Sequence, residues 1–470
     1  MSKHIKKKPF HFFFLILLFL FLFPSVCRAA TYYVATNGND GNNGTNTSSP
    51  LRTITAGISR LAGGDTLYIR AGTYTEALHG IPSGTAADHP TTISGYGGET
   101  VTINGIYSGY VGYFYNVQNI ILENLIIDGT SATNNTISLD WYTSNITLRN
   151  MTIQNAAWTA IFSRGDNHKF QNLDINRYGV DDANRRGHGF YIKGHNNLVE
   201  DCKIHHGSGH GVHVYATTPD PKPLNTIIRR NIFYANGHDS YYGRERVSGI
   251  GVYVGDNTLV YNNIVYDNGR GIAVNYSSTN AKIYNNTVFG NQFTGIYMGP
   301  ANNDANAATY EKTPASDTIV RNNIIYQNGT ALSDAGIRTV SDHNLTTNPS
   351  FVNIVSSPYD FHLQPGSPAI DTGIADGAPS TDFDGHGRPY GAGFDIGAFE
   401  YGSSGGGTPT PTPPSCPFAS SGDFNCDGKI NESDLNTLLS SWLTNGKDIT
   451  GDGIVNESDL NKLLGNWRTQ

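Results

Sequence analysis

The chain has 470 residues, with 31 Lys and Arg against 39 Asp and Glu, and only 15% of its residues are charged. It holds 54 Gly, 27 Tyr and 21 Phe but only 3 Met, and 38% of its residues are hydrophobic. This composition favours strands and turns and provides enough length for a large core. It argues against a helical bundle and against a disordered chain.

The first 29 residues have the features of a secretory signal peptide. Four lysines precede an unbroken apolar run at residues 12–23, and these 12 residues are fewer than the roughly 20 needed to span a membrane. The triplet Cys27-Arg28-Ala29 places small residues where a signal peptidase cleaves. Cleavage there leaves 26 basic against 39 acidic residues, about −13 in net charge. We therefore expect a secreted, extracellular or surface-attached protein that has no transmembrane span and does not bind nucleic acid.

Three cysteines remain after that cleavage. Cys416 and Cys426 lie close together in an exported chain, so we expect them to form a disulfide. Cys202 falls at an alternating strand position, where we expect a buried side chain without chemistry.

A short apolar strand around an Asn recurs through the middle of the chain, as in RRNIFY, YNNIVY and RNNIIY. Its separations are 26, 22, 29, 30, 32, 23 and 37 residues, which indicates a repeat near 22 residues with inserted loops. We expect the anchors to stack as one side-chain ladder in a solenoid. The anchors are Asn124, Asn150, Asn172, Asp201, Asn231, Asn263, Asn286 and Asn323.

Each repeat adds a second strand that opens with a small residue, as in GFYIK at 189, GVHVY at 211 and GIAVN at 271. Alternation with a period of two makes these segments strands. One coil cannot bury its own apolar face, so stacked coils share a core, with parallel strands about 4.8 Å apart. Eight anchors predict a rod of roughly 40 Å.

With these repeats, residues 31–340 resemble right-handed parallel β-helix proteins of the pectate-lyase type. The segment LRTITAGISRLAGGDTLYIRAGTYTE is similar to the N-terminal coils of secreted polysaccharide lyases. The resemblance implies a mainly β fold, a right-handed parallel β-helix over residues 30–340. Residues 341–401, which contain FHLQPGSPAIDTG and DFDGHGRPYGAGFDIGAFEY, look like the module that closes such helices, so we expect them to cap the last coil.

Residues 402–415, GSSGGGTPTPTPPS, have the composition of a linker. Beyond it, DFNCDGKINESDL at 423 and DITGDGIVNESDL at 448 repeat, each followed by an apolar stripe at helical spacing. Loop positions 1, 3, 5, 7, 9 and 12 supply the oxygen ligands that Ca²⁺ prefers. The first set is Asp423, Asn425, Asp427, Lys429, Asn431 and Asp434, and the second is Asp448, Thr450, Asp452, Ile454, Asn456 and Asp459.

The paired loops and the helix after each resemble a type I dockerin, a small α-helical EF-hand-like domain that we place at residues 416–470. The resemblance implies two bound Ca²⁺ ions and a cohesin module, on a scaffold or cell surface, as partner. The pairs Glu432-Ser433 and Glu457-Ser458 fall where family members carry recognition residues. Thr450 departs from the usual Asp or Asn, so we expect the second site to bind Ca²⁺ more weakly.

Long loops flank the Gly strands at residues 177–187, 216–224, 237–247 and 301–316 and would wall a groove. We expect alternate residues to face the core, namely Ile161, Phe190, Ile192, Val212, Val214, Val252, Val254, Ile272 and Val274. Their neighbours then form the groove floor, namely Phe162, Arg164, Tyr191, Lys193, His213, Tyr215, Tyr253, Asn275 and Tyr297. This set contains no carboxylate.

Cations beside aromatic rings suit an acidic polysaccharide, cleaved by β-elimination as in a polysaccharide lyase. The reaction needs the uronate carboxylate neutralised and a base for the adjacent proton. We predict Lys193 as base and Arg164 and His213 as charge stabilisers. His188, His210 and Tyr191 are alternatives for contact with the substrate. Sugar rings would stack on the aromatic residues Phe162, Tyr215, Tyr253 and Tyr297, and Asp181 and Asp182 could hold a catalytic Ca²⁺.

Two other functions stay open on the sequence. An inverting glycoside hydrolase needs two carboxyls roughly 6.5 to 9.5 Å apart, and Asp181, Asp182 and the GHG segment at 209 resemble polygalacturonases, although the companion motifs of that family are not found. A non-catalytic glycan-binding or adhesive rod would need the aromatic strip alone.

Overall fold

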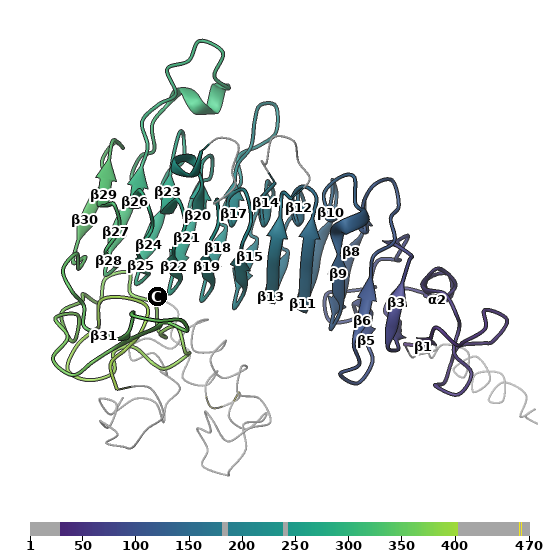
Figure 1. Cartoon of the computed structure of the whole chain (residues 1–470). Helices are drawn as coiled ribbons and strands as arrows, with labels where there is room; N and C mark the ends of the chain where they lie inside the picture. The colour runs from purple at the N-terminus through teal and green to yellow at the C-terminus, as the bar shows by residue number, and fades with distance from the viewer. Residues whose placement is uncertain (1–28, 181–186, 238–242, 403–459, 461, 463–470) are drawn as a thin grey trace, which may run out of the picture. The chain divides into compact units, whose positions relative to one another are not determined.

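The computed structural model describes residues 29–180, 187–237, 243–402, 460 and 462 (Figure 1). The chain divides into two compact units, residues 1–404 and 405–470. The signal peptide, nearly all of the linker, the calcium loops, Cys416, Cys426, Asp181 and Asp182 lie outside the described residues, so these predictions stay predictions. The fold described below is that of the first unit.

Short parallel strands stack coil upon coil along this unit (Figure 1). One sheet has ten strands, β4 (Leu78–His79), β7 (Gly112–Phe114), β10 (Ile137–Leu139), β12 (Ile161–Ser163), β14 (Phe190–Ile192), β17 (Val212–Val214), β20 (Ser248–Val252), β23 (Arg270–Val274), β26 (Thr294–Met298) and β29 (Thr330–Asp334). The second sheet begins with β1 (Thr31–Val34), β2 (Thr66–Ile69), β3 (Gly72–Tyr74), β5 (Thr91–Gly95), β6 (Val101–Ile103), β8 (Gln118–Glu123), β9 (Ile126–Asp128), β11 (Ser144–Ala156) and β13 (Lys169–Tyr178).

The second sheet continues through β15 (Leu198–Glu200), β16 (Lys203–His205), β18 (Ile227–Arg229), β19 (Ile232–Tyr234), β21 (Leu259–Tyr261), β22 (Ile264–Tyr266), β24 (Lys282–Tyr284), β25 (Thr287–Phe289), β27 (Ile319–Arg321), β28 (Ile324–Tyr326) and β30 (Val340–Asp342). Three short 3₁₀ helices, η1 (Gly129–Ser131), η2 (Arg244–Arg246) and η3 (Thr309–Lys312), lie in connections between strands. The predicted mainly β solenoid of parallel strands is confirmed.

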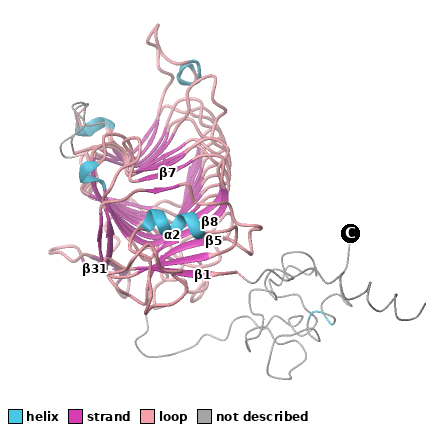
Figure 2. Ribbon diagram, turned by 90° about the vertical axis from the view of Figure 1, so that its right-hand side faces the viewer, coloured by secondary structure: helices cyan, strands magenta, loops and turns pink. Residues whose placement is uncertain are grey.

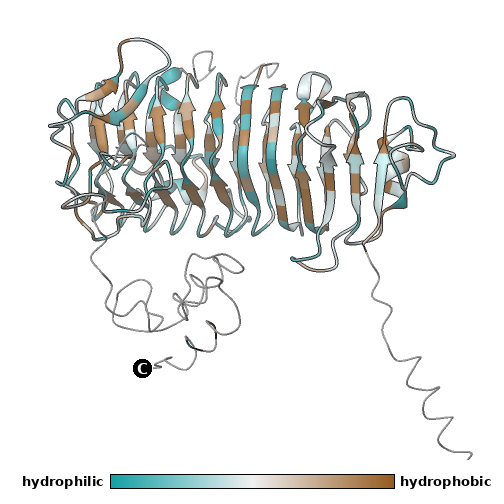
Figure 3. Ribbon diagram, turned by 90° about the horizontal axis from the view of Figure 1, so that it is seen from below, coloured by the Kyte–Doolittle hydropathy of each residue, from teal (hydrophilic) through white to brown (hydrophobic). Residues whose placement is uncertain are grey.

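The core lies between the sheets and follows the predicted alternation. Val212 pairs with Ile250 and Ile250 with Ile272 along three successive coils, and all three side chains are fully buried. Hydrophobic residues recur in rows along the stacked strands (Figure 3). All nine residues that we expected to face the core are fully buried. Stacking therefore supplies the burial that a single coil lacks.

The asparagine anchors form two columns rather than the single ladder that we expected. Asn124, Asn150, Asn172 and Asp201 adopt positive φ, and the strand register continues this column through Arg230 and Asn262. Asn231 stands one position further along the chain and belongs to a second column. Its backbone N–H donates to the Oδ1 of Asn263 at 3.0 Å. The expected equivalence between Asp201 and Asn231 is therefore wrong by one residue.

The buried column is a continuous amide ladder from Asn231 through Asn263, Asn286 and Asn323 to Asn344, with side-chain bonds of 2.9 to 3.0 Å. A parallel ladder at the next bend, which we had not predicted, joins Asn236, Asn268, Asn291 and Asn328. Each amide also donates to a backbone carbonyl, so the bends satisfy their buried polar groups.

Helix α2 (Ile54–Arg60) lies across the N-terminal end of the coil (Figure 2). Its first turn is capped by Thr53, whose Oγ1 accepts the Ala56 N–H at 3.1 Å. The helix buries its own side chains Ile54 and Ile58. The helix thus covers apolar side chains that the first coil would otherwise expose.

Residues 343–401 pack on the side of the helix rather than over its last coil, which corrects our expectation of an end cap. The antiparallel pair β31 (Phe351–Asn353) and β32 (Asp360–Leu363) contributes to a core with the outward-facing side chains of β22, β25 and β28. Val340 in the last coil is 44% exposed. The reason is that Ile264, Phe289 and Ile324 present an apolar outer face, whose burial favours the lateral position.

Cys202 is buried, as expected, and burial raises the pKa of its thiol. No helix within the described ranges is both long and apolar enough to cross a membrane.

Candidate active site

The outer surface of the ten-stranded sheet carries three rows of side chains. The middle row is set by register, because Phe162 pairs with Tyr191, Tyr191 with His213, His213 with Gly251, Gly251 with Ala273 and Ala273 with Tyr297. Their neighbours on each strand face the core. The structure thus places Phe162, Tyr191, His213 and Tyr297 on one surface, which we call the outer face.

A second row is formed by the residue that follows each strand. The N–H of Lys193 donates to Ser163 O at 2.8 Å, that of Tyr215 to Ile192 O at 3.1 Å and that of Tyr253 to Val214 O at 2.9 Å. The parallel hydrogen-bond pattern therefore continues past the strand ends. It aligns Arg164, Lys193, Tyr215, Tyr253 and Asn275 beside the middle row.

The third row lies at the start of the strands. His188 and His210 precede β14 and β17, and Ser248 and Arg270 are the first residues of β20 and β23. Gly189 N–H donates to His210 O at 2.9 Å, Gly211 N–H donates to Ser248 O at 3.2 Å, and Ser248 pairs with Arg270. Arg270 was not predicted as a site residue. The sequence pattern of the strand starts at the small residue that follows it, Gly271, so only the two histidines of this row were predicted.

Aromatic rings from the three rows meet around His213. Its ring lies 4.5 Å from His188, 4.7 Å from His210, 5.0 Å from Tyr191 and Tyr215, and 5.2 Å from Tyr253, between centroids. We call these six residues the imidazole cluster. The predicted alternatives His188, His210 and Tyr191 are therefore in contact with His213.

Burial controls the charge of the three histidines. It lowers the pKa of His188 and His213 well below the usual value and that of His210 to about 3. The rings are therefore neutral near pH 7. His213 cannot supply the positive charge that we had expected of it as a charge stabiliser.

Hydrogen bonds fix two of these rings. The Nδ1 of His188 accepts the His210 N–H at 3.1 Å, and the Nδ1 of His210 accepts the Ser248 N–H at 2.9 Å. Their remaining proton is then on Nε2. His213 differs, because within the described part of the chain both of its ring nitrogens are buried and lack a hydrogen-bond partner.

The two predicted cations of the outer face are paired with carboxylates that we had not foreseen there. Lys193 Nζ lies 2.6 Å from Asp220 Oδ2, and Arg164 Nη1 lies 3.2 Å from Asp140 Oδ1. The Arg164 guanidinium also stacks on Trp141 and Phe162, at 4.7 and 5.0 Å from the ring centroids. The expectation of a floor without carboxylates nearby is wrong, since Asp140 occupies the Arg164 row one coil earlier.

Arg270 is the cation of this face for which the described residues provide no carboxylate within ion-pair distance. Its guanidinium lies over the Tyr297 ring at 4.1 Å from the centroid. Its Nε is buried without a hydrogen-bond partner. The arginine also lies near the hydroxyl of Tyr253 and lowers the pKa of His210.

Two loops wall the outer face beyond the second row. Tyr215 Oη donates to Glu311 Oε1 at 2.6 Å, and Tyr310 Oη donates to Asp220 O at 3.1 Å. The loops at 216–224 and 301–316 therefore brace each other above Tyr215. Tyr253 and Asn275 are buried, whereas Phe162 and Tyr297 are partly exposed and can contact a ligand.

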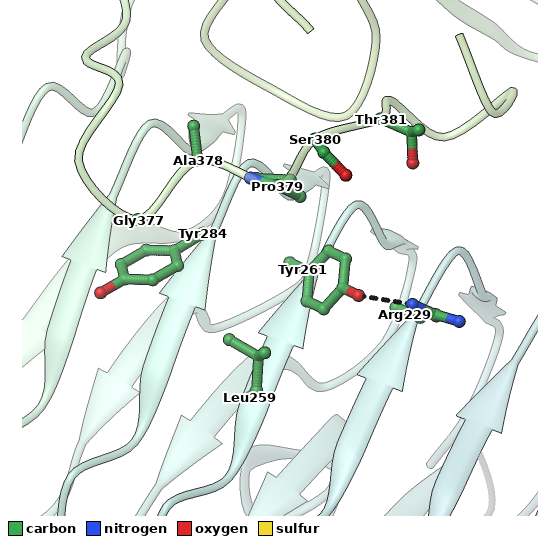
Figure 4. A pocket seen from close by; sticks show the side chains of 9 residues that line it. All are labelled: Arg229, Leu259, Tyr261, Tyr284, Gly377, Ala378, Pro379, Ser380 and Thr381. Atoms are coloured by element: carbon green, nitrogen blue, oxygen red, sulfur yellow. Dashed lines mark hydrogen bonds between the residues drawn. The ribbon is translucent and has the colours of Figure 1, made fainter. Parts of the chain in front are cut away.

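A separate pocket of about 270 Å³ lies on the other sheet, between residues 377–381 and strands β18, β21 and β24 (Figure 4). Arg229 Nη1 donates to the Tyr261 hydroxyl at 2.8 Å across it. Arg229 is also paired with Glu200 at 2.6 Å. The guanidinium of Arg229, the charged group of this pocket, therefore already has partners within the protein.

The chain matches proteins of one family over most of its β-helix. The family described as Pel9A-like, right-handed β-helix region, matches residues 32–323. The uncharacterized protein YwoF of Bacillus subtilis is 26% identical over 341 residues, 63% of this chain and 69% of YwoF. Pectate lyase PEL9 of Emericella nidulans is 40% identical over 86 residues, but these cover only 18% of this chain and 20% of that protein.

Among solved structures, pectate lyase Pel9A has a similar fold. The TM-score is 0.54 at 17% sequence identity, and the match covers 79% of this chain and 96% of Pel9A. This likeness supports the architecture, and the family match covers more than half of the sequence. The chain therefore belongs to the Pel9A-like right-handed β-helix family.

Proposed function

We propose that the protein is an exported polysaccharide lyase that cleaves an acidic, uronate-containing polysaccharide by β-elimination on the outer face. The observation that carries the proposal is the alignment of Arg164, Lys193 and Arg270 with aromatic rings on one surface of the ten-stranded sheet. Two similar proteins, PEL9 and Pel9A, are pectate lyases, which makes polygalacturonate the first substrate to test.

The geometry suits a chain with one carboxylate on each sugar. Arg164 and Lys193 stand one coil apart, about 4.8 Å, and Arg270 lies three coils beyond Lys193, so these cations can neutralise carboxylates at separate points along one bound chain. Phe162 and Tyr297 are at the two ends of the middle row and offer ring faces for stacking on sugars. Tyr253 is buried and the Tyr215 hydroxyl is bonded to Glu311, so we expect these two residues to support the floor.

The remaining parts of the proposal concern residues outside the described ranges. A signal peptide at residues 1–29 would export the chain, and a dockerin at residues 416–470 with two Ca²⁺ ions would attach it to a cohesin-bearing scaffold or surface. Asp181 and Asp182, in the loop before β14, are candidates for holding a further Ca²⁺ beside the substrate. These parts rest on the sequence motifs alone.

The experiment is a substrate screen with two readouts. The full chain is incubated with polygalacturonate, alginate and glycosaminoglycans, while ultraviolet absorbance reports unsaturated uronate and a separate assay counts reducing ends. Both signals should rise together for a lyase. Reducing ends without absorbance would establish a hydrolase, and binding without either signal would establish a glycan-binding rod.

A further inference from the structure

We propose that His213 takes the proton in this reaction and that Arg270 binds the carboxylate of the sugar that loses it. The inference rests on the proposed lyase function and replaces Lys193 as the predicted base. It names a catalytic residue and a specificity residue for the same outer face.

His213 is the imidazole of the cluster whose ring nitrogens make no hydrogen bond within the described part of the chain. Its side chain is 8% exposed, and neither ring nitrogen has a hydrogen-bond partner among the described residues. His188 and His210 each use Nδ1 to accept a backbone N–H, so their Nε2 can only donate. A buried polar ring that is left unpaired costs free energy, which a site recovers when a ligand supplies the partner.

Lys193 is poorly placed to act as base. Its ammonium lies 2.6 Å from the Asp220 carboxylate. It would have to leave the carboxylate and lose its proton before it could accept another. Lys193 is better suited to bind a carboxylate of a neighbouring sugar.

The Tyr253 side chain lies close to both His213 and Arg270. The Tyr253 ring lies 5.2 Å from His213, and its hydroxyl lies near Arg270. His213 and Arg270 belong to β17 and β23, two coils apart, which is about 10 Å along the axis. An arginine side chain and a uronate residue together span that distance, with the sugar over Tyr253.

Gly251 makes this arrangement possible. It follows His213 in the middle row, and a Cβ at this position would lie 3.2 Å from the Tyr253 ring and 3.3 Å from His210 Nδ1. The missing side chain lets the Tyr253 ring pack over the strand and against both histidines. A larger residue would displace the ring that links His213 to Arg270.

The reaction balances without another reactant. His213 takes the proton from C5, the C5–H electron pair becomes the C4–C5 double bond, and the bond from C4 to O4 breaks. The imidazolium then gives its proton to the departing O4, which restores the neutral ring. Arg270 stabilises the negative charge that develops on the carboxylate as C5 loses its proton.

The test compares His213→Ala, Lys193→Met and, as a matched control, His343→Asn in an exposed histidine far from this face. We expect His213→Ala to lower kcat by about 100-fold or more, because a general base contributes about 10² to 10⁴. Added imidazole should restore part of that activity, whereas it would not repair a merely structural defect. Lys193→Met should raise KM and leave kcat within about tenfold.

Arg270→Gln is tested on the free polyuronate and on its methyl ester. The unsubstituted enzyme should prefer the free acid, and the variant should lose most of that preference, because the ester has no charge for the guanidinium to bind. An unchanged preference would overturn the role of Arg270. Full activity in His213→Ala would overturn the role of His213. The same conclusion would follow if His213→Ala lost its activity without rescue by imidazole and Lys193→Met abolished kcat. In these cases the unsubstituted chain still acts as a lyase, whereas absence of elimination in that chain would refute the proposed function itself.

Discussion

Lys193 Nζ and Asp220 Oδ2 lie 2.6 Å apart on the outer face, and both side chains are largely shielded from solvent. The pair joins the end of β14 to the loop at 216–224. A polyuronate that binds to Lys193 must therefore compete with a carboxylate of the protein. This internal competitor leads to the first prediction.

Asp220→Asn should strengthen substrate binding. Loss of the competing charge leaves the Lys193 ammonium free to bind a uronate, so we expect KM to fall by about fivefold at low salt with little change in kcat. The gain should shrink as salt screens the interaction. Asp88→Asn, at a carboxylate with 80% side-chain exposure, is the control and should leave KM unchanged. Equal KM values for Asp220→Asn and the unsubstituted chain at low salt would contradict the competition.

Asn286→Ala should destabilise the helix strongly. The Asn286 side chain accepts the Asn263 N–H at 3.0 Å and donates to Val260 O and to Asn323 Oδ1, both at 3.0 Å. Its removal leaves several buried groups unpaired, at about 1 to 3 kcal/mol each, so we expect a loss of at least about 3 kcal/mol in the free energy of unfolding. Urea denaturation measures this loss. Asn306→Ala, at an exposed loop position, should have little effect, and similar losses in the two variants would refute the importance of the ladder.

Stability should fall in acid because of buried neutral histidines. Burial lowers the pKa of His168 to about 3, and its Nδ1 accepts the Ile146 N–H at 3.1 Å. In the unfolded chain His168 takes up a proton near the usual pKa of about 6.5, whereas in the folded chain it stays neutral down to about pH 3. The contribution of neutral His168 to the free energy of unfolding is therefore complete above about pH 6.5 and is lost as the pH falls toward about 3. Denaturation at a series of pH values should show a weaker pH dependence for His168→Asn than for the unsubstituted chain. The exposed-site variant His343→Asn should retain the full dependence, and a His168→Asn curve parallel to the parent would contradict this account.

Calcium should bind to the full chain at two sites of unequal affinity. Calorimetry should detect two ions, the weaker at the loop that contains Thr450, because a threonine hydroxyl is a poorer Ca²⁺ ligand than the carboxylate or amide carbonyl that is usual there. Asp423→Ala combined with Asp448→Ala should abolish both. A flat titration of the unsubstituted chain would refute the dockerin prediction.

The architecture could be predicted because its signals are periodic. All nine residues that alternation assigned to the core, from Ile161 to Val274, are fully buried. The ladder was misassigned by one position because doublets such as Asn262-Asn263 offer two registers, and only the pairing of Glu200 with Arg229 and of Arg229 with Tyr261 settles which is equivalent to Asp201.

The active-site details were less accessible to sequence reasoning. The partners of Lys193 and Arg164 lie 27 and 24 residues away and depend on how a loop folds back or on the length of the previous coil. Arg270 is the first residue of β23, outside the segment from Gly271 onward in which alternation was visible. The neutral state of His213 results from burial among rings contributed by three successive coils, which no local pattern encodes.

The most direct measurement is a crystal structure of the His213→Ala variant with an oligosaccharide of the polyuronate that gives the strongest elimination signal. The account predicts sugar density across β14, β17 and β20, with one carboxylate at Arg270 and another at Lys193. An oligosaccharide bound instead in the pocket of Arg229 and Tyr261, with the outer face unchanged, would contradict it.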